Sequence, residues 1–146
     1  MSWFSSKQGK PVRTRTDLIN FLIRSFQYQR YLEIGVRNPR HNFNRIDIKE
    51  KDGVDPAGKC RYTLTSDLFF ETVAPKIPPY DIILIDGLHL AEQVLRDVTN
   101  SLAHLNPGGT IVLHDCNPPS AAHQVEQYDG KSDWNGTVWK AFVLFR

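Results

Sequence analysis

Four side chains suited to chemistry lie in two short segments of the sequence, Asp86 and His89 in IDGLH, and His114 and Asp115 in LHD. Both segments follow apolar runs, so each polar group stands where a buried strand is expected to end. Two carboxylates offer the hard oxygen ligands that Mg²⁺ or Ca²⁺ binds in proteins. A neutral imidazole can take a proton near neutral pH. The residue types therefore indicate a cation site, a general base, or both.

Each of these roles has a plainer alternative. Asp86 and Asp115 can accept hydrogen bonds from the backbone N–H groups of the turns that follow them. His89 can hydrogen-bond locally at a helix start, and His114 can pack at a strand end. If the two strands are neighbours, they lie about 4.8 Å apart, so the two carboxylates can share one cation, with Asn117 as a further oxygen ligand. The sequence leaves these alternatives open, and the cation and histidine routes can coexist.

Hydrophobic periodicity predicts the elements that must position these residues. Apolar residues at helical spacing predict helices at 16–26, behind a Thr-Asp start that can cap the first turn, and at 90–105, where NPGG ends the helix. Residues 137–146 predict a final helix, with a strand as the alternative. Strands are predicted at 30–36, 51–56, 61–67, 80–86 and 110–115.

The alternation of these elements predicts the fold class. Near-continuous apolar strands separated by helices require a parallel sheet that is covered on both faces. We therefore predict an α/β fold, a Rossmann-like three-layer sandwich with a mainly parallel five-stranded sheet in the order 3-2-1-4-5. Residues 1–15 are expected to form an N-terminal arm and residues 16–146 a single domain.

Composition excludes several classes of protein. The 146 residues are 40% hydrophobic and 23% charged, as is typical of a globular domain. A net charge of +2 is too small to indicate nucleic-acid binding, and no apolar run approaches the roughly 18 residues that span a membrane. The two cysteines form no metal or redox motif. We expect a cytoplasmic protein with free thiols, and a solvated arm for the basic residues Lys7, Lys10, Arg13 and Arg15.

The carboxyl ends of the predicted strands indicate a nucleoside site. In an open parallel sheet, ligands bind beyond these ends. Asp55 follows Glu33 by about 20 residues, the spacing at which a carboxylate reaches ribose hydroxyls; the alternative is a cap on the turn before Pro56. The first loop has one glycine, Gly35, whereas a pyrophosphate needs G-x-G-x-x-G. This pattern favours a nucleoside without phosphates over NAD or FAD.

Five motifs in the same order resemble the class I S-adenosylmethionine-dependent methyltransferases, in particular a bacterial branch with IDG-x-H and HD strand ends. They are YLEIGV (31–36), GVDP (53–56), TSDLFF (65–70), YDIILIDGLHLAEQVLRD (80–97) and LNPGGTIVLHDCNPP (105–119). The resemblance implies a methyltransferase-like Rossmann domain over residues 16–146. Members normally have two further strands after the last helix found here, so the resemblance also implies a domain truncated at its C terminus or a compact variant.

The resemblance implies a role for each polar residue at the strand ends. Glu33 and Gly35 would line the amino-acid end of the cofactor, Asp55 would hold its ribose, Ser66 and Asp67 would lie by its adenine, and Asp86 would lie beside the sulfonium and the reacting centre. Some members use a cation to bind two acceptor hydroxyls, and Mg²⁺ held by Asp86 and Asp115 would act in this way.

The function implied is methyl transfer from S-adenosylmethionine to an oxygen, or less readily a nitrogen, of a small polar acceptor such as a sugar or a secondary metabolite. Asp86, His89 and His114 would orient the acceptor and remove its proton. The alternative is a non-catalytic nucleoside-binding or interaction module. An oxidoreductase conflicts with the missing phosphate loop. Trp134 and Trp139 can belong to a lid over the acceptor, or to the core, and a homo-oligomer is left open.

Overall fold

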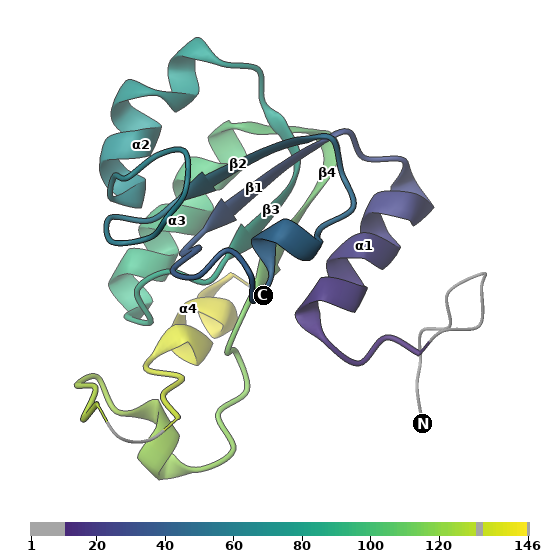
Figure 1. The fold of residues 1–146 in the computed structure, drawn as a ribbon. Coiled ribbons are helices and arrows are strands. Elements are labelled where there is room, and N and C mark those ends of the chain that lie inside the picture. Colours follow the sequence, from purple (N-terminus) through teal and green to yellow (C-terminus); the bar gives the residue numbers. More distant parts are fainter. Residues whose placement is uncertain (1–10, 131–132, 146) are drawn as a thin grey trace.

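The computed structural model describes residues 11–130 and 133–145 of the chain. Its elements are α1 (Arg15–Phe26), β1 (Arg30–Ile34), η1 (Phe43–Arg45), β2 (Glu50–Val54), α2 (Ser66–Thr72), η2 (Ala74–Lys76), β3 (Tyr80–Ile85), α3 (Ala91–Ala103), β4 (Leu105–Leu113), η3 (Ala121–Gln124) and α4 (Val138–Leu144). The strands form one parallel sheet in the order β2-β1-β3-β4. Helix α1 covers one face, and α2, α3 and α4 lie on the other (Figure 1).

Two apolar clusters separate the three layers. On one face, Ile19 and Ile23 of α1 pack on Tyr31, Ile82 and Leu84 of the central strands. The opposite face carries the larger cluster, which joins the sheet to α2, α3 and α4. Strands β1 and β3 are buried on both faces, which explains their near-continuous apolar sequences. The predicted α/β three-layer sandwich is confirmed.

The strand predicted at 61–67 is not formed, and the described part of the chain has a four-stranded sheet. Tyr62 makes one isolated parallel bridge to Val54, on the outer side of β2. The chain then turns into α2, because the Thr65 side chain accepts a hydrogen bond from the N–H of Leu68 and caps the helix. The four strands that do form keep the predicted order.

Helix α1 begins one residue earlier than predicted. Thr14 is the N-cap, and Thr14 and Asp17 exchange hydrogen bonds in a capping box. Arg15, assigned from the sequence to a solvated arm, is therefore the first residue of α1. Lys7 and Lys10, which were expected in the same arm, lie outside the described residues.

Helix α3 ends before the NPGG segment, and this segment lies within β4. Helix α3 ends at Ala103, and β4 already begins at Leu105, earlier than the predicted start of the strand. The pairing of Tyr80 with Leu105 and of Ile82 with Thr110 shows that NPGG bulges out of the ladder. The predicted final helix is also present, as α4. In the described part of the chain, no helix has the length and apolar character needed to cross a membrane.

The register of the sheet brings four strand ends together. Ile34 pairs with Val54 on one side and with Ile85 on the other, and Ile85 pairs with Leu113. The residues that follow these four positions therefore leave the sheet side by side at its carboxyl edge. They are Gly35, Asp55, Asp86 and His114.

Candidate active site

A cavity of about 830 Å³ lies at this carboxyl edge, a size that suits a nucleoside together with a small acceptor. The sequence-predicted residues that line it are Gly35, Asp55, Ser66, Asp67, Asp86, His89, His114 and Asp115. A smaller hollow of about 320 Å³, between α3, β4 and α4, is lined almost wholly by apolar side chains. The larger cavity holds the chemistry-bearing residues and is the candidate site.

Gly35 lets the first loop pass close over the end of β3. Its φ is +89°, and a Cβ atom built there would lie 2.1 Å from the carbonyl oxygen of Asp86. The Gly35 N–H donates to the Val54 carbonyl at 2.8 Å, so the residue is also held by β2. Only glycine fits this backbone conformation and this contact.

Asp55 both caps its turn and lines the cavity. Its carboxylate accepts hydrogen bonds from the N–H groups of Arg37 and Ala57, each at 2.8 Å. Asp55 thus caps its turn, which is the alternative role that the sequence allows. A carboxylate has about four lone-pair sites, however, so Asp55 can still accept hydrogen bonds from ribose hydroxyls.

Ser66 and Asp67 lie at the start of α2 and face Gln93 of α3. The Gln93 amide nitrogen Nε2 is 3.2 Å from the Ser66 hydroxyl and 3.1 Å from a carboxylate oxygen of Asp67. Gln93 lines the cavity with them. The polar residues that line the cavity at the start of α2 therefore have a partner, Gln93, that the sequence motifs did not single out.

Glu33 is placed differently from the other predicted cofactor residues. It is buried and is not among the residues that line the cavity. Its carboxylate accepts hydrogen bonds from the Tyr31 hydroxyl at 2.6 Å and from the Asn42 amide at 2.8 Å, and Thr16 donates to Asn42 at 2.7 Å. Burial raises the pKa of Glu33. The side chain ties β1 to α1, and its contact with a cofactor stays a prediction.

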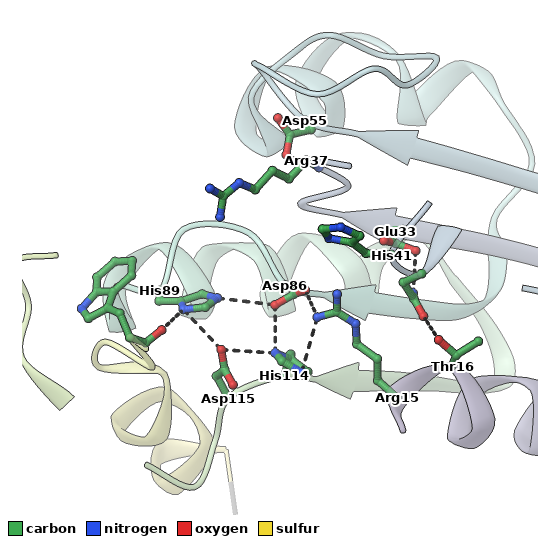
Figure 2. Close-up of polar contacts among 12 residues, drawn as sticks. Arg15, Thr16, Glu33, Arg37, His41, Asp55, Asp86, His89, His114 and Asp115 are labelled. Atoms are coloured by element: carbon green, nitrogen blue, oxygen red, sulfur yellow. Dashed lines mark hydrogen bonds and ion pairs between the residues drawn. The ribbon is translucent and has the colours of Figure 1, made fainter. Parts of the chain in front are cut away.

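Asp86 is the centre of the polar cluster (Figure 2). One oxygen, Oδ1, lies 3.0 Å from Nδ1 of His114 and 3.4 Å from Nε2 of His89, and the other, Oδ2, pairs with the Arg15 guanidinium. Burial alone would raise the pKa of Asp86, but the two imidazoles and Arg15 outweigh it and lower the pKa to about 2. The carboxylate is therefore ionised at any physiological pH.

His114 lies between two carboxylates. Its Nδ1 is 3.2 Å from Asp115 Oδ2 and 3.0 Å from Asp86 Oδ1. Asp115 and Asp86 together outweigh burial and raise the pKa of His114 to about 9. At neutral pH the ring is an imidazolium without a free lone pair, which favours His89 over His114 as a proton acceptor.

Residues 134–137 hold His89 in place. Its Nδ1 lies 3.0 Å from the Trp134 carbonyl, and its ring stacks on the Trp134 indole with centroids 5.2 Å apart. The Thr137 N–H donates to the His89 carbonyl at 2.8 Å, and the Thr137 hydroxyl accepts from Ala91 at 2.8 Å, which caps α3. Because a carbonyl only accepts, Nδ1 keeps its proton. Nε2 faces the Asp86 carboxylate at 3.4 Å and is therefore the nitrogen that can accept a proton once the ring is neutral.

The match to known proteins agrees with this geometry. A family described as "Methyltransferase domain" matches residues 25–116, well over half of the chain. The chain belongs to this methyltransferase family. The matched region runs from the end of α1 to the residue after Asp115, so it contains all four strands and the strand ends that line the cavity. The resemblance to class I methyltransferases is confirmed.

A curated relative points in the same direction. The mycinamicin VI 2''-O-methyltransferase of Micromonospora griseorubida is 31% identical to this chain over 81 residues. The match covers 53% of this chain and 20% of that enzyme. The matched part of the chain thus spans about a fifth of the relative's length.

Asp86, His114 and Asp115 of this methyltransferase-family chain are close enough to share a cation. One potential ligand atom from each lies within 4.8 Å of the others. Two carboxylates and a neutral imidazole fit a divalent ion, whereas the imidazolium now between them does not. Asn117, proposed from the sequence as a further ligand, is exposed and does not line the cavity. The two sequence-predicted ligands, Asp86 and Asp115, are brought together.

His114→Gln tests this charge cluster through the pH dependence of stability. The raised pKa of His114 means that its pairing stabilises the fold fully below pH 6.5 and is lost as the pH rises through about 9. The lowered pKa of Asp86 gives a contribution that is present above pH 3.8 and lost as the pH falls through about 2. The free energy of unfolding should therefore fall between pH 6.5 and 9 in the wild type, and fall less in His114→Gln.

Urea denaturation at the two ends of this pH range measures the difference. His41→Gln is the matched control, because His41 is an exposed histidine outside the cluster of carboxylates. The free energy of unfolding of His41→Gln should fall over this pH range by as much as that of the wild type. Equal pH dependence in His114→Gln and the wild type would contradict the ion pairs described for His114.

Sequence reasoning missed three residues that line the cavity and contact predicted site residues, namely Arg15, Arg37 and Gln93. The capping-box pattern of Thr14 and Asp17 is a signal from which the sequence could have placed Arg15 in the helix. The sequence allows Trp134 in a lid but does not indicate that it contacts His89, and Trp139 does not line the cavity. No local signal marks Gln93 or Arg37.

Proposed function

We propose that the protein transfers the methyl group of S-adenosylmethionine to an oxygen of a small polar acceptor, such as a sugar or a secondary metabolite. The observation that carries this proposal is the convergence of Gly35, Asp55, Asp86 and His89 in one cavity of a methyltransferase-family fold. The relative named above is by its name an O-methyltransferase, which favours oxygen over nitrogen. A cytoplasmic location, and the absence of nucleic-acid and membrane partners, stay predictions.

The donor half of the cavity, in which the methyl donor S-adenosylmethionine would bind, is the side next to β1 and β2. Asp55 offers acceptors for the two ribose hydroxyls, and Ser66, Asp67 and Gln93 form a polar wall for the adenine. Gly35 allows close approach of the backbone to the ligand. When bound, S-adenosylmethionine supplies an electrophilic methyl group on a positive sulfonium, so the protein mainly has to orient the acceptor and remove its proton.

The acceptor half of the cavity, in which the methyl acceptor would bind, is the side next to β3 and β4. His89 Nε2 takes the proton of the acceptor hydroxyl as the new oxygen–carbon bond forms, while the Trp134 carbonyl keeps the proton on Nδ1. The ionised Asp86, 3.4 Å away, stabilises the imidazolium that results. Mg²⁺ held by Asp86 and Asp115, with His114 neutral, would lower the pKa of the acceptor hydroxyl.

Asp55→Ala should weaken the binding of S-adenosylhomocysteine at least about tenfold, because the ribose loses its charged hydrogen-bond acceptor. The melting temperature should fall modestly, since two backbone hydrogen bonds are lost as well. Isothermal titration calorimetry measures the affinity. Asp47→Ala, which removes an exposed carboxylate that does not line the cavity, should leave it unchanged. Equal affinities for Asp55→Ala and the wild type would remove the ribose assignment.

Turnover with a panel of hydroxylated acceptors separates an enzyme from a non-catalytic nucleoside-binding module. Release of S-adenosylhomocysteine with any acceptor supports methyl transfer. Tight binding of S-adenosylhomocysteine without turnover on the whole panel would favour the module.

A further inference from the structure

Arg15 reaches from the start of α1 into the polar cluster at the end of β3. Its Nη1 pairs with Oδ2 of Asp86 and lies 3.4 Å from Nε2 of His114. The side chain of Asp86 is 10% exposed and that of Arg15 is 27% exposed. Figure 2 shows the guanidinium beside the carboxylate, on the side opposite His89. The contact joins residues that are far apart in the sequence.

Arg15 is held in this position by the residues around it. Thr14 and Asp17 close a capping box that fixes the first turn of α1. The next residue, Thr16, is buried and donates to Asn42, which in turn donates to Glu33 in β1. The helix start is thereby tied to the central sheet, and the direction of the Arg15 side chain is built into the fold.

The contact occupies the oxygen of Asp86 that the histidines leave free. Oδ1 faces His114 and His89, whereas Oδ2 faces Arg15. A guanidinium keeps its positive charge at all physiological pH values and offers a fixed fork of donors to a carboxylate. A divalent cation that binds Asp86 must therefore compete with a cation that belongs to the protein itself.

We propose that Arg15 is the resident counter-cation of Asp86 and sets the divalent-cation affinity of the site. The ion binds fully only when the guanidinium leaves Oδ2. This inference rests on the cation site at Asp86 and Asp115 that forms part of the proposed function. It makes Arg15 a positioning residue that controls whether the site carries a metal ion.

The test is the affinity for Mn²⁺, used as the probe ion and measured by electron paramagnetic resonance on the protein without nucleoside. Arg15→Gln should bind Mn²⁺ at least about fivefold more tightly than the wild type, because the competing charge is gone. Arg15→Lys keeps a positive charge and should stay close to the wild type. Arg13→Gln removes an exposed arginine two residues earlier and should have no effect.

Two further measurements make the outcomes decisive. Asp86→Asn combined with Arg15→Gln should abolish the added Mn²⁺ affinity, which locates the ion. Unchanged or weaker Mn²⁺ binding by Arg15→Gln, or no binding by either protein, would overturn the inference. Calorimetry with S-adenosylhomocysteine on the same proteins keeps the two proposals apart: retained nucleoside binding with unchanged Mn²⁺ affinity rejects only the role of Arg15, whereas no nucleoside binding by the wild type rejects the proposed function.

Discussion

Gly35→Ala should destabilise the fold by roughly 3 kcal/mol or more and should abolish nucleoside binding. The added Cβ would lie 2.1 Å from the Asp86 carbonyl oxygen, 2.4 Å from its carbonyl carbon and 2.7 Å from the Gly87 Cα. All three are backbone atoms at the end of the central strand, so no side chain can rotate away to make room. The φ of +89° adds conformational strain for any residue with a Cβ.

Gly108→Ala is the matched control for this prediction. Gly108 has nearly the same conformation, with φ of +80°, but its Cβ would meet nothing within 4 Å. The substitution should therefore cost only the backbone strain, about 1 kcal/mol. Urea denaturation gives both free energies of unfolding. Equal losses in the two variants would show that the close approach of Gly35 to β3 does not matter for stability.

His89→Ala should lower kcat by about 10²–10⁴-fold, the usual contribution of a general base. The affinity for S-adenosylhomocysteine should change little, because His89 is assigned to the acceptor half of the cavity. Burial lowers the pKa of His89, but Asp86 and the Trp134 carbonyl outweigh it and raise the pKa above 6.5. The wild-type rate should accordingly rise with pH through this raised value, and the residual rate of the variant should lack that rise.

The rate of S-adenosylhomocysteine release with an active acceptor measures this effect. His123→Ala is the control, since His123 does not line the cavity and bonds to Ser120 near the surface. It should keep at least half of the wild-type rate, by the usual size of effects away from a site. A loss of less than about fivefold in His89→Ala would assign proton removal elsewhere.

Sequence patterns predicted the sheet well because its strands carry strong signals. Strands β1 and β3 are buried on both faces, so their apolar residues run almost without interruption. The segment 61–67 looked similar, but its Thr-Ser-Asp also matches a helix start. Thr65 caps α2, and only Tyr62 remains paired with the sheet. A local cap here outweighed the strand preference of its neighbours.

The site was predicted best where residues directly follow strand ends. Gly35, Asp55, Asp86 and His114 come together because the register of a parallel sheet aligns the positions after paired residues. Glu33 lies inside its strand, where side chains alternate between faces, and its side chain joins Tyr31 and Asn42. Its position in a motif could not show which face it would occupy.

Contacts across long stretches of sequence could not be predicted in the same way. Arg15 meets Asp86 only because α1 packs across the sheet, and Trp134 meets His89 only because the loop before α4 folds back on α3. Neither contact leaves a periodic or local pattern. These two partners change the chemistry most. Arg15 balances the negative charge of the ionised Asp86, and the Trp134 carbonyl decides which nitrogen of His89 can accept a proton.

The most direct measurement is an NMR titration of the ¹⁵N-labelled protein with S-adenosylhomocysteine. The glycines serve as reporters, since Gly35 and Gly87 line the cavity, whereas Gly108 lies outside it, in the NPGG bulge within β4. We predict saturable shifts at Gly35 and Gly87 and none at Gly108. An absence of shifts at millimolar ligand, or shifts that spare Gly35 and Gly87, would contradict a nucleoside site at the carboxyl edge of the sheet.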